Sequence, residues 1–256
     1  MNQNEKENMI RLNKYLASCG LGSRRSCDSL IGSGRIYVNG TKVKKLGTKV
    51  TIGKDRVEYL GKSLEPVLSF RYIAFHKPQG IIVTKSDPEG RETVFDALRQ
   101  AGCDAGGLNC VGQLDVASEG LLLLTNDGSL IHALTHPRYH IKKVYDVQLD
   151  RKLSPGDAEV MTGPGIESEG QVLRAGAVLE TGMAGRFWYH VELYKGKKRQ
   201  IRRMFEAVGC AVLRLRRVQF ASIKLGDLAP GAFRELTDRE VAALRAAGFP
   251  PSSSSR

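Results

Sequence analysis

The 256-residue sequence contains no apolar run that approaches the roughly 18 residues needed to cross a bilayer. Its first residues, Met1 to Asn8, are polar, whereas a secretory signal has a charged stub followed by an apolar stretch. Both absences argue against a membrane-spanning or secreted protein. We therefore expect a cytosolic protein.

Patterns for metals, disulfides and nucleotide cofactors are also missing. The five cysteines are odd in number, and none belongs to a C-x-x-C pair or lies near a histidine at ligand spacing. The five histidines are dispersed, so we expect free thiols and no zinc site. The sequence also has no Walker loop, no dinucleotide fingerprint after a strand and no repeat of solenoid period.

Positive charge is abundant and unevenly distributed. The chain carries a net charge of +12, of which residues 1–65 hold +7 and residues 195–217 hold +8, so that the remainder is −3. Clustered cations favour an elongated polyanion, because phosphate neutralisation releases counterions. The alternative is that both clusters are solvated faces of the protein.

The first fifty residues predict two short helices followed by a hairpin. Leu12, Tyr15, Leu16 and Cys19 fall at helical spacing, and Gly20 is placed to end that helix. Ser23 is the expected N-cap of a second helix that ends at Gly32 to Gly34. The run Arg35-Ile-Tyr-Val-Asn-Gly40 and the return Thr41-Lys-Val43 predict a tight hairpin.

These motifs carry a resemblance. R-L-N-K-Y-L-A-S-C-G-L-G-S-R-R-S followed by G-R-I-Y-V-N-G-T-K-V, from about Arg11 to Leu64, closely resembles the S4-type (alpha-L) RNA-binding domain. The resemblance implies that structured RNA is held through phosphates and shape by Arg11, Lys14, Arg24, Arg25 and Arg35. Arg24 and Arg25 oppose the dipole of their helix, so binding explains them better than stability does.

The rest of the chain predicts an α+β domain on a largely antiparallel sheet. A linker is expected around Glu65 to Phe70, giving domains at 9–65 and 70–250. Mixed strand and helix patterns then alternate. Expected strands are 72–75, 80–84, 144–149 and 187–193, and expected helices are 94–100, 129–135, 200–208 and 238–247.

Asp115 is the first candidate for chemistry, because it lies between two strand-like apolar runs. On generic grounds such an aspartate is a turn or cap residue. At the floor of a cleft, and kept ionised by a cation, it could instead act as a nucleophile.

The surrounding motif is G-x-L-D-x-x-S-E-G-L-L-L-L-T-N-D-G, from Gly112 to Gly128. It resembles the signature of the RsuA-like pseudouridine synthases, which modify ribosomal RNA. H-K-P-Q-G, D-P-E-G-R-E-T-V, H-P-R-Y, K-V-Y, G-K-K-R-Q-I-R-R-M and K-L-G-D-L-A-P-G extend the resemblance along the chain in the same order. It implies a catalytic domain with a central, largely antiparallel mixed β-sheet flanked by helices.

The resemblance implies three catalytic residues. Asp115 corresponds to the catalytic aspartate, and Tyr145 to a tyrosine that stacks on the target base. A basic partner for the aspartate lies in R-Q-I-R-R. On a helix, Arg202 borders the apolar stripe while Arg199 and Arg203 lie nearly opposite it. We therefore favour Arg202 as the partner, with Arg199 second, and expect Arg199 and Arg203 to contact phosphates. The alternative is an exposed basic face.

Two further positions concern how the substrate is held. The family usually has arginine where this sequence has Gln113, which puts contacts with flanking nucleotides in doubt. Leu225 is the expected apolar residue beneath the target base.

The implied reaction breaks the bond from nitrogen 1 of uracil to ribose, turns the base and rejoins it through carbon 5, so no metal, redox carrier or nucleotide is needed. Asp115 would attack the anomeric carbon or remove a ribose proton. The expected partner is ribosomal RNA, 16S or 23S, free or within an assembly intermediate, bound by a monomer. The rivals are a non-catalytic RNA-binding or ribosome-assembly protein and an enzyme of DNA or free nucleotides.

Overall fold

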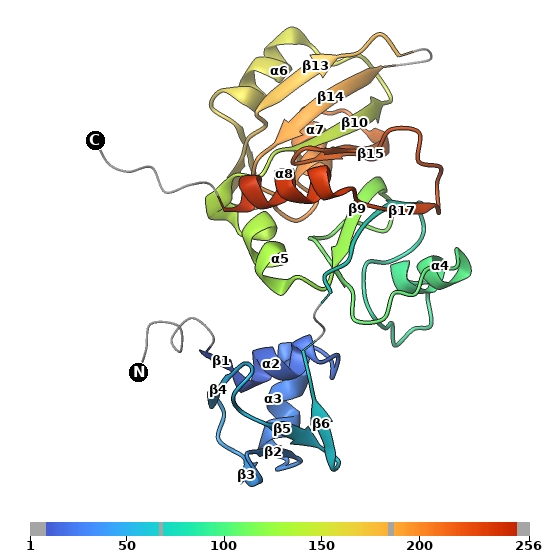
Figure 1. The fold of residues 1–256 in the computed structure, drawn as a ribbon. Helices are drawn as coiled ribbons and strands as arrows, with labels where there is room; N and C mark the ends of the chain where they lie inside the picture. The colour runs from blue at the N-terminus through green and yellow to red at the C-terminus, as the bar shows by residue number, and fades with distance from the viewer. Residues whose placement is uncertain (1–8, 67–68, 184–186, 250–256) are drawn as a thin grey trace. The chain divides into compact units, whose positions relative to one another are not determined.

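The structure is a computed structural model that describes residues 9–66, 69–183 and 187–249. The chain divides into two compact units at Phe70 and Arg71 (Figure 1). Within the described residues, no helix is long and apolar enough to cross a membrane. All five cysteines are free in the structure.

The described residues of the first unit form two helices and two small antiparallel sheets. β1 pairs with β4, and the second sheet has the order β3-β2-β5-β6. The elements are β1 Met9–Arg11, α2 Leu12–Ser18, α3 Arg24–Gly32, β2 Ile36–Val38, β3 Thr41–Val43, β4 Lys49–Thr51, β5 Val57–Tyr59 and β6 Lys62–Leu64.

Local signals in the sequence determine this unit. The Ser23 hydroxyl accepts a hydrogen bond from the Ser26 N–H at 3.1 Å, which caps α3 as predicted. Asn39 and Gly40 have φ of 51° and 75°, the left-handed pair that a two-residue hairpin requires. The helices and sheets enclose a small core that includes Leu12, Leu16 and Ile31.

The second unit is built on a nine-stranded mixed sheet with the main order β13-β14-β10-β15-β9-β7-β17. β8 pairs with β9, and β16 with β15. Its elements are β7 Tyr72–Lys77, α4 Val94–Gln100, β8 Asn109–Cys110, β9 Glu119–Thr125, α5 Gly128–Thr135, η1 Pro137–Tyr139, β10 Lys143–Leu149, α6 Pro155–Thr162, β11 Ile166–Ser168, β12 Gln171–Leu173, β13 Ala177–Glu180, β14 Trp188–Leu193, α7 Gln200–Ala207, β15 Val212–Phe220, β16 Ile223–Lys224, β17 Phe233–Glu235 and α8 Asp238–Gly248.

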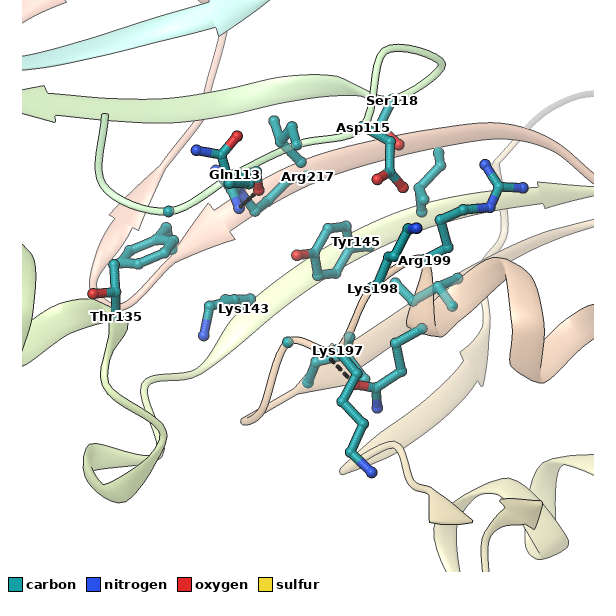
Figure 2. A pocket seen from close by; sticks show the side chains of 18 residues that line it. Gln113, Asp115, Ser118, Thr135, Lys143, Tyr145, Lys197, Lys198, Arg199 and Arg217 are labelled. Atoms are coloured by element: carbon teal, nitrogen blue, oxygen red, sulfur yellow. Dashed lines mark hydrogen bonds between the residues drawn. The ribbon is translucent and has the colours of Figure 1, made fainter. Parts of the chain in front are cut away.

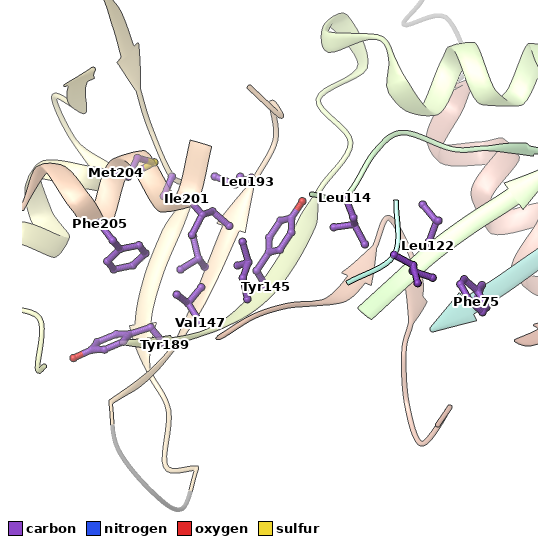
Figure 3. Close-up of a cluster of buried hydrophobic side chains, with 14 of the residues drawn as sticks. Phe75, Leu114, Leu122, Tyr145, Val147, Tyr189, Leu193, Ile201, Met204 and Phe205 are labelled. Atoms are coloured by element: carbon purple, nitrogen blue, oxygen red, sulfur yellow. The ribbon is translucent and has the colours of Figure 1, made fainter. Parts of the chain in front are cut away.

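Helices cover both faces of this sheet. Side chains of α4, α6 and α7 join one large apolar cluster, part of which Figure 3 shows. On the other face, α5 and α8 lie side by side (Figure 1) and pack against β7 and β9. The α+β class and the four predicted helices are confirmed, with ends that differ by one residue at most.

β9 and β15 form a parallel pair, whereas the other pairings of named strands in the described sheet are antiparallel. Gly120 faces Arg217 across this pair and has a φ of 107°. A Cβ at Gly120 would lie 2.3 Å from the Arg217 carbonyl oxygen. The close approach of the two strands therefore requires glycine.

The predicted strand 80–84 is wrong. Ile81 and Ile82 are both buried, so the segment does not alternate, and Ile82 forms a single isolated bridge to Thr93. Ile82 instead turns beneath the start of α4, where its N–H donates to Glu92 O and its carbonyl accepts from Val94 N.

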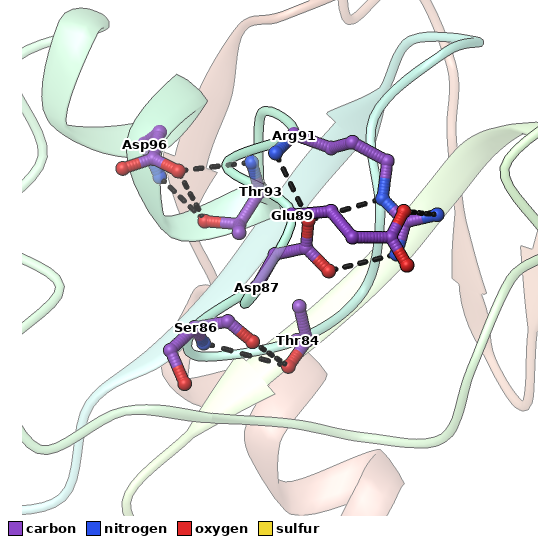
Figure 4. A network of polar contacts seen from close by, with 7 residues as sticks. All are labelled: Thr84, Ser86, Asp87, Glu89, Arg91, Thr93 and Asp96. Atoms are coloured by element: carbon purple, nitrogen blue, oxygen red, sulfur yellow. Dashed lines mark hydrogen bonds and ion pairs between the residues drawn. The ribbon is translucent and has the colours of Figure 1, made fainter.

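The D-P-E-G-R-E-T-V motif builds the turn that follows. Asp87 accepts two hydrogen bonds from the Arg91 side chain, and Thr93 and Asp96 form a capping box (Figure 4). The described contacts of this motif are thus structural: they fix the start of α4.

Candidate active site

Asp115 lies in the loop 111–118, between β8 and β9. Its backbone carbonyl accepts from the Ser118 N–H at 3.0 Å, and the Val116 carbonyl accepts from the Gly80 N–H at 2.9 Å. The H-K-P-Q-G motif that ends β7 therefore supports the loop that carries Asp115. The side chain of Asp115 is partly buried.

Three buried cations hold the carbonyls of this loop. Lys77 Nζ donates to Ser118 O at 2.8 Å and to Val116 O at 3.4 Å, and Arg202 Nη2 donates to Ala117 O at 2.9 Å. Arg217 Nη1 donates to Gln113 O at 3.3 Å. These three side chains come from β7, α7 and β15. The loop conformation thus depends on segments far apart in the sequence.

Burial lowers the pKa of Lys77 to about 8, although Asp115 and Glu119 act in the opposite direction. The residue is fully buried. Its ammonium is also bonded to Pro78 O at 2.9 Å. Lys77 therefore places a positive charge behind the aspartate without contacting solvent.

Asp115 lines a cavity of about 470 Å³ (Figure 2). This volume lies within the range of small-molecule sites. Tyr145 from β10 and Arg199, which precedes α7, line the same cavity. Its remaining lining residues are Gly112, Gln113, Leu114, Ser118, Thr135, Lys143, Leu193, Gly196, Lys197, Lys198, Gln200, Ile201, Leu215, Arg217 and Phe220.

The cavity has an apolar wall and a cationic rim. Figure 3 shows the Tyr145 ring between Leu114 on one side and Leu193 and Ile201 on the other. Only 8% of Tyr145 is exposed, so packing fixes its ring. Lys197, Lys198 and Arg199 are exposed. Such a site suits a flat, partly apolar group attached to an anionic chain.

Lys143 also lines the cavity, and its pKa is lowered to about 8 by burial and by the nearby Arg217. Its ammonium donates to Ile141 O at 2.9 Å and lies 5.3 Å from the centroid of the Phe220 ring. Lys143 is not among the site residues predicted from the sequence. The K-V-Y motif that contains it was the available signal.

The three predicted arginines of the 199–203 segment occupy different environments. Arg202 donates to Ala117 O and Val212 O, both at 2.9 Å, instead of to the Asp115 carboxylate. Among the described residues, no lysine or arginine forms an ion pair with that carboxylate. Asp115 nevertheless acts electrostatically on Arg202, whose pKa is lowered chiefly by burial. The predicted partner therefore contacts the backbone of the loop 111–118 that carries Asp115.

Arg199 and Arg203 have contrasting surroundings. Arg199 has a φ of 49°, precedes the helix as its N-cap and keeps an exposed side chain in the cavity. Arg203 is only 8% exposed, and its guanidinium donates to Ser168 Oγ and Ser168 O. The helical spacing placed Arg203 on an exposed face, but the β11–β12 hairpin covers that face. These contacts argue against a phosphate-binding role for Arg203.

Leu225 does not line the cavity. It is 6% exposed and packs in the cluster beneath α5 and α8. Leu215 of β15, which sequence reasoning missed, lies in the apolar wall instead. The side chain of Gln113 is exposed, and its carbonyl is held by Arg217.

The predicted RNA-binding cations of the first unit are all exposed. Arg11 lies in β1, Lys14 in α2, and Arg24 and Arg25 in the first turn of α3, while Arg35 precedes β2. Since none of these side chains contributes to the core, all five are available to bind an anion.

Two known protein families match the chain, one in each of its two compact units. The family model for RNA pseudouridylate synthase matches residues 71–207, and that for the S4 domain matches residues 10–57. "Ribosomal large subunit pseudouridine synthase B" of Bacillus subtilis (strain 168) is 36% identical over 249 residues, covering 93% of this chain and 96% of that protein.

Two further proteins extend the comparison. An "Uncharacterized RNA pseudouridine synthase" of Aquifex aeolicus (strain VF5) is 36% identical over 237 residues, covering 92% of this chain and 93% of that protein. A solved structure described as "Crystal structure of pseudouridylate synthase" is 26% identical with a TM-score of 0.65, covering 92% of this chain and 99% of that one.

Proposed function

Because the chain belongs to the RNA pseudouridylate synthase family and is an isomerase of RNA, we propose that it converts a uridine of large-subunit ribosomal RNA into pseudouridine in the Asp115 cavity. The observation that carries this proposal is the meeting of a carboxylate, a phenol ring and a guanidinium, from Asp115, Tyr145 and Arg199, around one cavity. The choice of the large subunit rests on the name of the Bacillus relative.

The cavity suits a uridine withdrawn from its stack. A carboxylate cannot reach a ribose carbon inside a helix, so the nucleotide must turn out of the RNA. Tyr145 supplies the stacking surface, which is worth about 1–3 kcal/mol per base. Leu114, Ile201 and Leu215 complete an apolar wall. These contacts exclude water from the glycosidic bond.

Asp115 assists the cleavage of that bond by attack on the anomeric carbon or by removal of a ribose proton. Its position is fixed by hydrogen bonds that Lys77, Arg202 and Arg217 donate to backbone carbonyls of the same loop. Arg202 thus acts on Asp115 by holding its loop and by its charge, while Arg199 is the guanidinium that lines the cavity. The uracil, once detached, turns within the cavity and rejoins the ribose through carbon 5.

The first unit provides a separate RNA-binding surface. Arg11, Lys14, Arg24, Arg25 and Arg35 are exposed cations that neutralise phosphates. The affinity contributed by them falls with salt. We propose that the protein acts in the cytoplasm as a monomer, on free rRNA or on an assembly intermediate.

The test is to incubate the protein with transcripts of each ribosomal RNA, and with assembly intermediates, and to map pseudouridine by carbodiimide-blocked primer extension. We expect one stop in large-subunit RNA with wild type and none with Asp115→Asn. Asp104→Asn is the matched control, since Asp104 is exposed and outside the cavity and asparagine keeps the acceptor for Gly106 N.

Equal stops from wild type and Asp115→Asn, or none from either on any RNA, would overturn the enzyme proposal. A stop confined to small-subunit RNA would overturn the choice of subunit alone. Light scattering measures the mass of the purified protein in solution. The mass of a dimer would contradict the proposed monomer.

A further inference from the structure

A second cavity adjoins the first. Its volume is about 450 Å³, and Lys197 and Gln200 line both cavities. Its charged, polar and aromatic lining side chains are His140, Arg174, Tyr194, Lys195, Lys197 and Gln200. No acidic residue lines it among the described residues.

Gln200 builds the wall between the cavities. Only 5% of this residue is exposed. Its Oε1 accepts from the Lys197 N–H at 3.1 Å, and its Nε2 donates to Arg174 O at 2.9 Å. One buried amide therefore fixes the backbone of two cationic residues that line the second cavity.

Lys197 is directed toward the second cavity. Figure 2 shows its side chain running away from Asp115 and Tyr145. Its ammonium donates to Val172 O at 3.1 Å, and Val172 lines the second cavity. Arg174 is held in a similar way, because its Nε donates to Pro164 O at 2.9 Å. Both cations are therefore placed by hydrogen bonds.

Tyr194 gives this cavity an aromatic surface. A Cβ at Gly176 would lie 2.4 Å from Cε2 of Tyr194, so the ring rests against the glycine backbone. The residue keeps 41% of its surface exposed. Its hydroxyl is 3.5 Å from Glu192, whose carboxylate is paired with Lys142. Packing thus orders a ring that the fold leaves accessible.

An exposed ring among cations is the chemistry that binds single-stranded nucleic acid, through base stacking and phosphate contact. We propose that the second cavity binds a nucleotide flanking the target uridine, with its base on Tyr194 and its phosphate among Arg174, Lys195 and Lys197. This inference rests on the proposed function for its choice of RNA. It makes the cavity a subsite that selects the single-stranded segment next to the reacting base.

Binding tests the subsite without catalysis. Fluorescence anisotropy with a labelled nine-residue oligouridylate should give a Kd about 5- to 150-fold weaker for Tyr194→Ala than for wild type, the loss expected for one stacked base. Tyr194→Phe should restore most of the lost affinity. The control is Leu179→Ala, because Leu179 is 60% exposed and lines neither cavity. Equal Kd values for wild type and Tyr194→Ala would overturn the proposal.

The position of the stacked base is then found with the mapped rRNA substrate. An abasic residue is placed at each position beside the target uridine, and RNA affinity is measured again. At one position, the abasic RNA should bind wild type more weakly by the same factor by which Tyr194→Ala weakens binding of the intact RNA. Tyr194→Ala should then bind that abasic RNA with no further loss of affinity. Additive losses at every position would contradict the assignment. If wild type forms no pseudouridine, the proposed function is overturned. The oligouridylate Kd values would still show whether Tyr194 stacks on a base in the second cavity.

Discussion

Lys77→Met tests the buried cation that holds the loop 111–118, which carries Asp115. The substitution removes the ammonium that donates to Ser118 O at 2.8 Å and to Pro78 O at 2.9 Å, while it keeps a side chain of similar length. The buried Ser118 carbonyl and the partly buried Pro78 carbonyl lose a donor, at about 1–3 kcal/mol each. This loss of stability is partly offset, because the substitution also removes the Lys77 charge, whose burial is unfavourable.

The offset follows from the pKa of Lys77, which burial lowers from 10.5 to about 8. That displacement corresponds to roughly 3 kcal/mol at 1.36 kcal/mol per pH unit. The two effects are of the same order and opposite sign at pH 7. Between pH 8 and pH 10.5 the unfolded wild type binds more protons than the folded protein does, so the free energy of unfolding rises with pH. The Met variant lacks this contribution.

We therefore expect the stability advantage of wild type over Lys77→Met to grow by up to about 3 kcal/mol from pH 7 to pH 10.5. Urea titrations followed by the fluorescence of Trp188 measure this stability difference in the second unit. Trp188 is buried there and is the single tryptophan of the chain. Other groups that titrate in this range, including Lys143, contribute to both proteins and cancel. The same pH dependence in both proteins would refute the reasoning.

Two further substitutions test the contacts around the loop. Gly120→Ala places a methyl group 2.3 Å from Arg217 O at a φ of 107°, so we expect a loss of roughly 3 kcal/mol or more in the same urea titration; an unchanged midpoint would contradict it. Arg202→Lys keeps the charge but cannot donate to Ala117 O and Val212 O in the fork geometry of a guanidinium. We expect kcat to fall at least about tenfold with little change in KM, and an unaltered kcat would show that the fork is dispensable.

Elements with local signals could be predicted from the sequence. Ser23 caps its helix, and the Asn39–Gly40 pair closes its hairpin, because neither feature needs a distant partner. The helix 94–100 was predicted to the residue, since its capping box is contained in Thr93 to Asp96.

β15 could not be predicted, although it lies at the centre of the sheet. Its alternation is obscured by arginines, which typically indicate an exposed segment. Arg214 pairs with Glu119 at 2.6 Å and Arg216 with Asp146 at 2.8 Å, from strands about seventy to a hundred residues away. Only the tertiary structure reveals that these charges are neutralised.

Part of the cavity lining could be predicted from the sequence. The motifs identified Asp115 and Tyr145, which line one cavity. Lys77 and Arg217 were missed, because their importance comes from burial and from carbonyl partners that a sequence does not show. Leu225 was chosen by its motif, but β15 places Leu215 in the cavity wall instead.

The release of tritium from rRNA that contains 5-tritiated uridine tests the central claim most directly. When carbon 5 joins the ribose its hydrogen passes to water, so each turnover releases one tritium. We predict that Asp115→Asn binds the RNA but releases tritium at less than about one thousandth of the wild-type rate, while Asp104→Asn matches wild type. Release by Asp115→Asn at the wild-type rate would contradict the account.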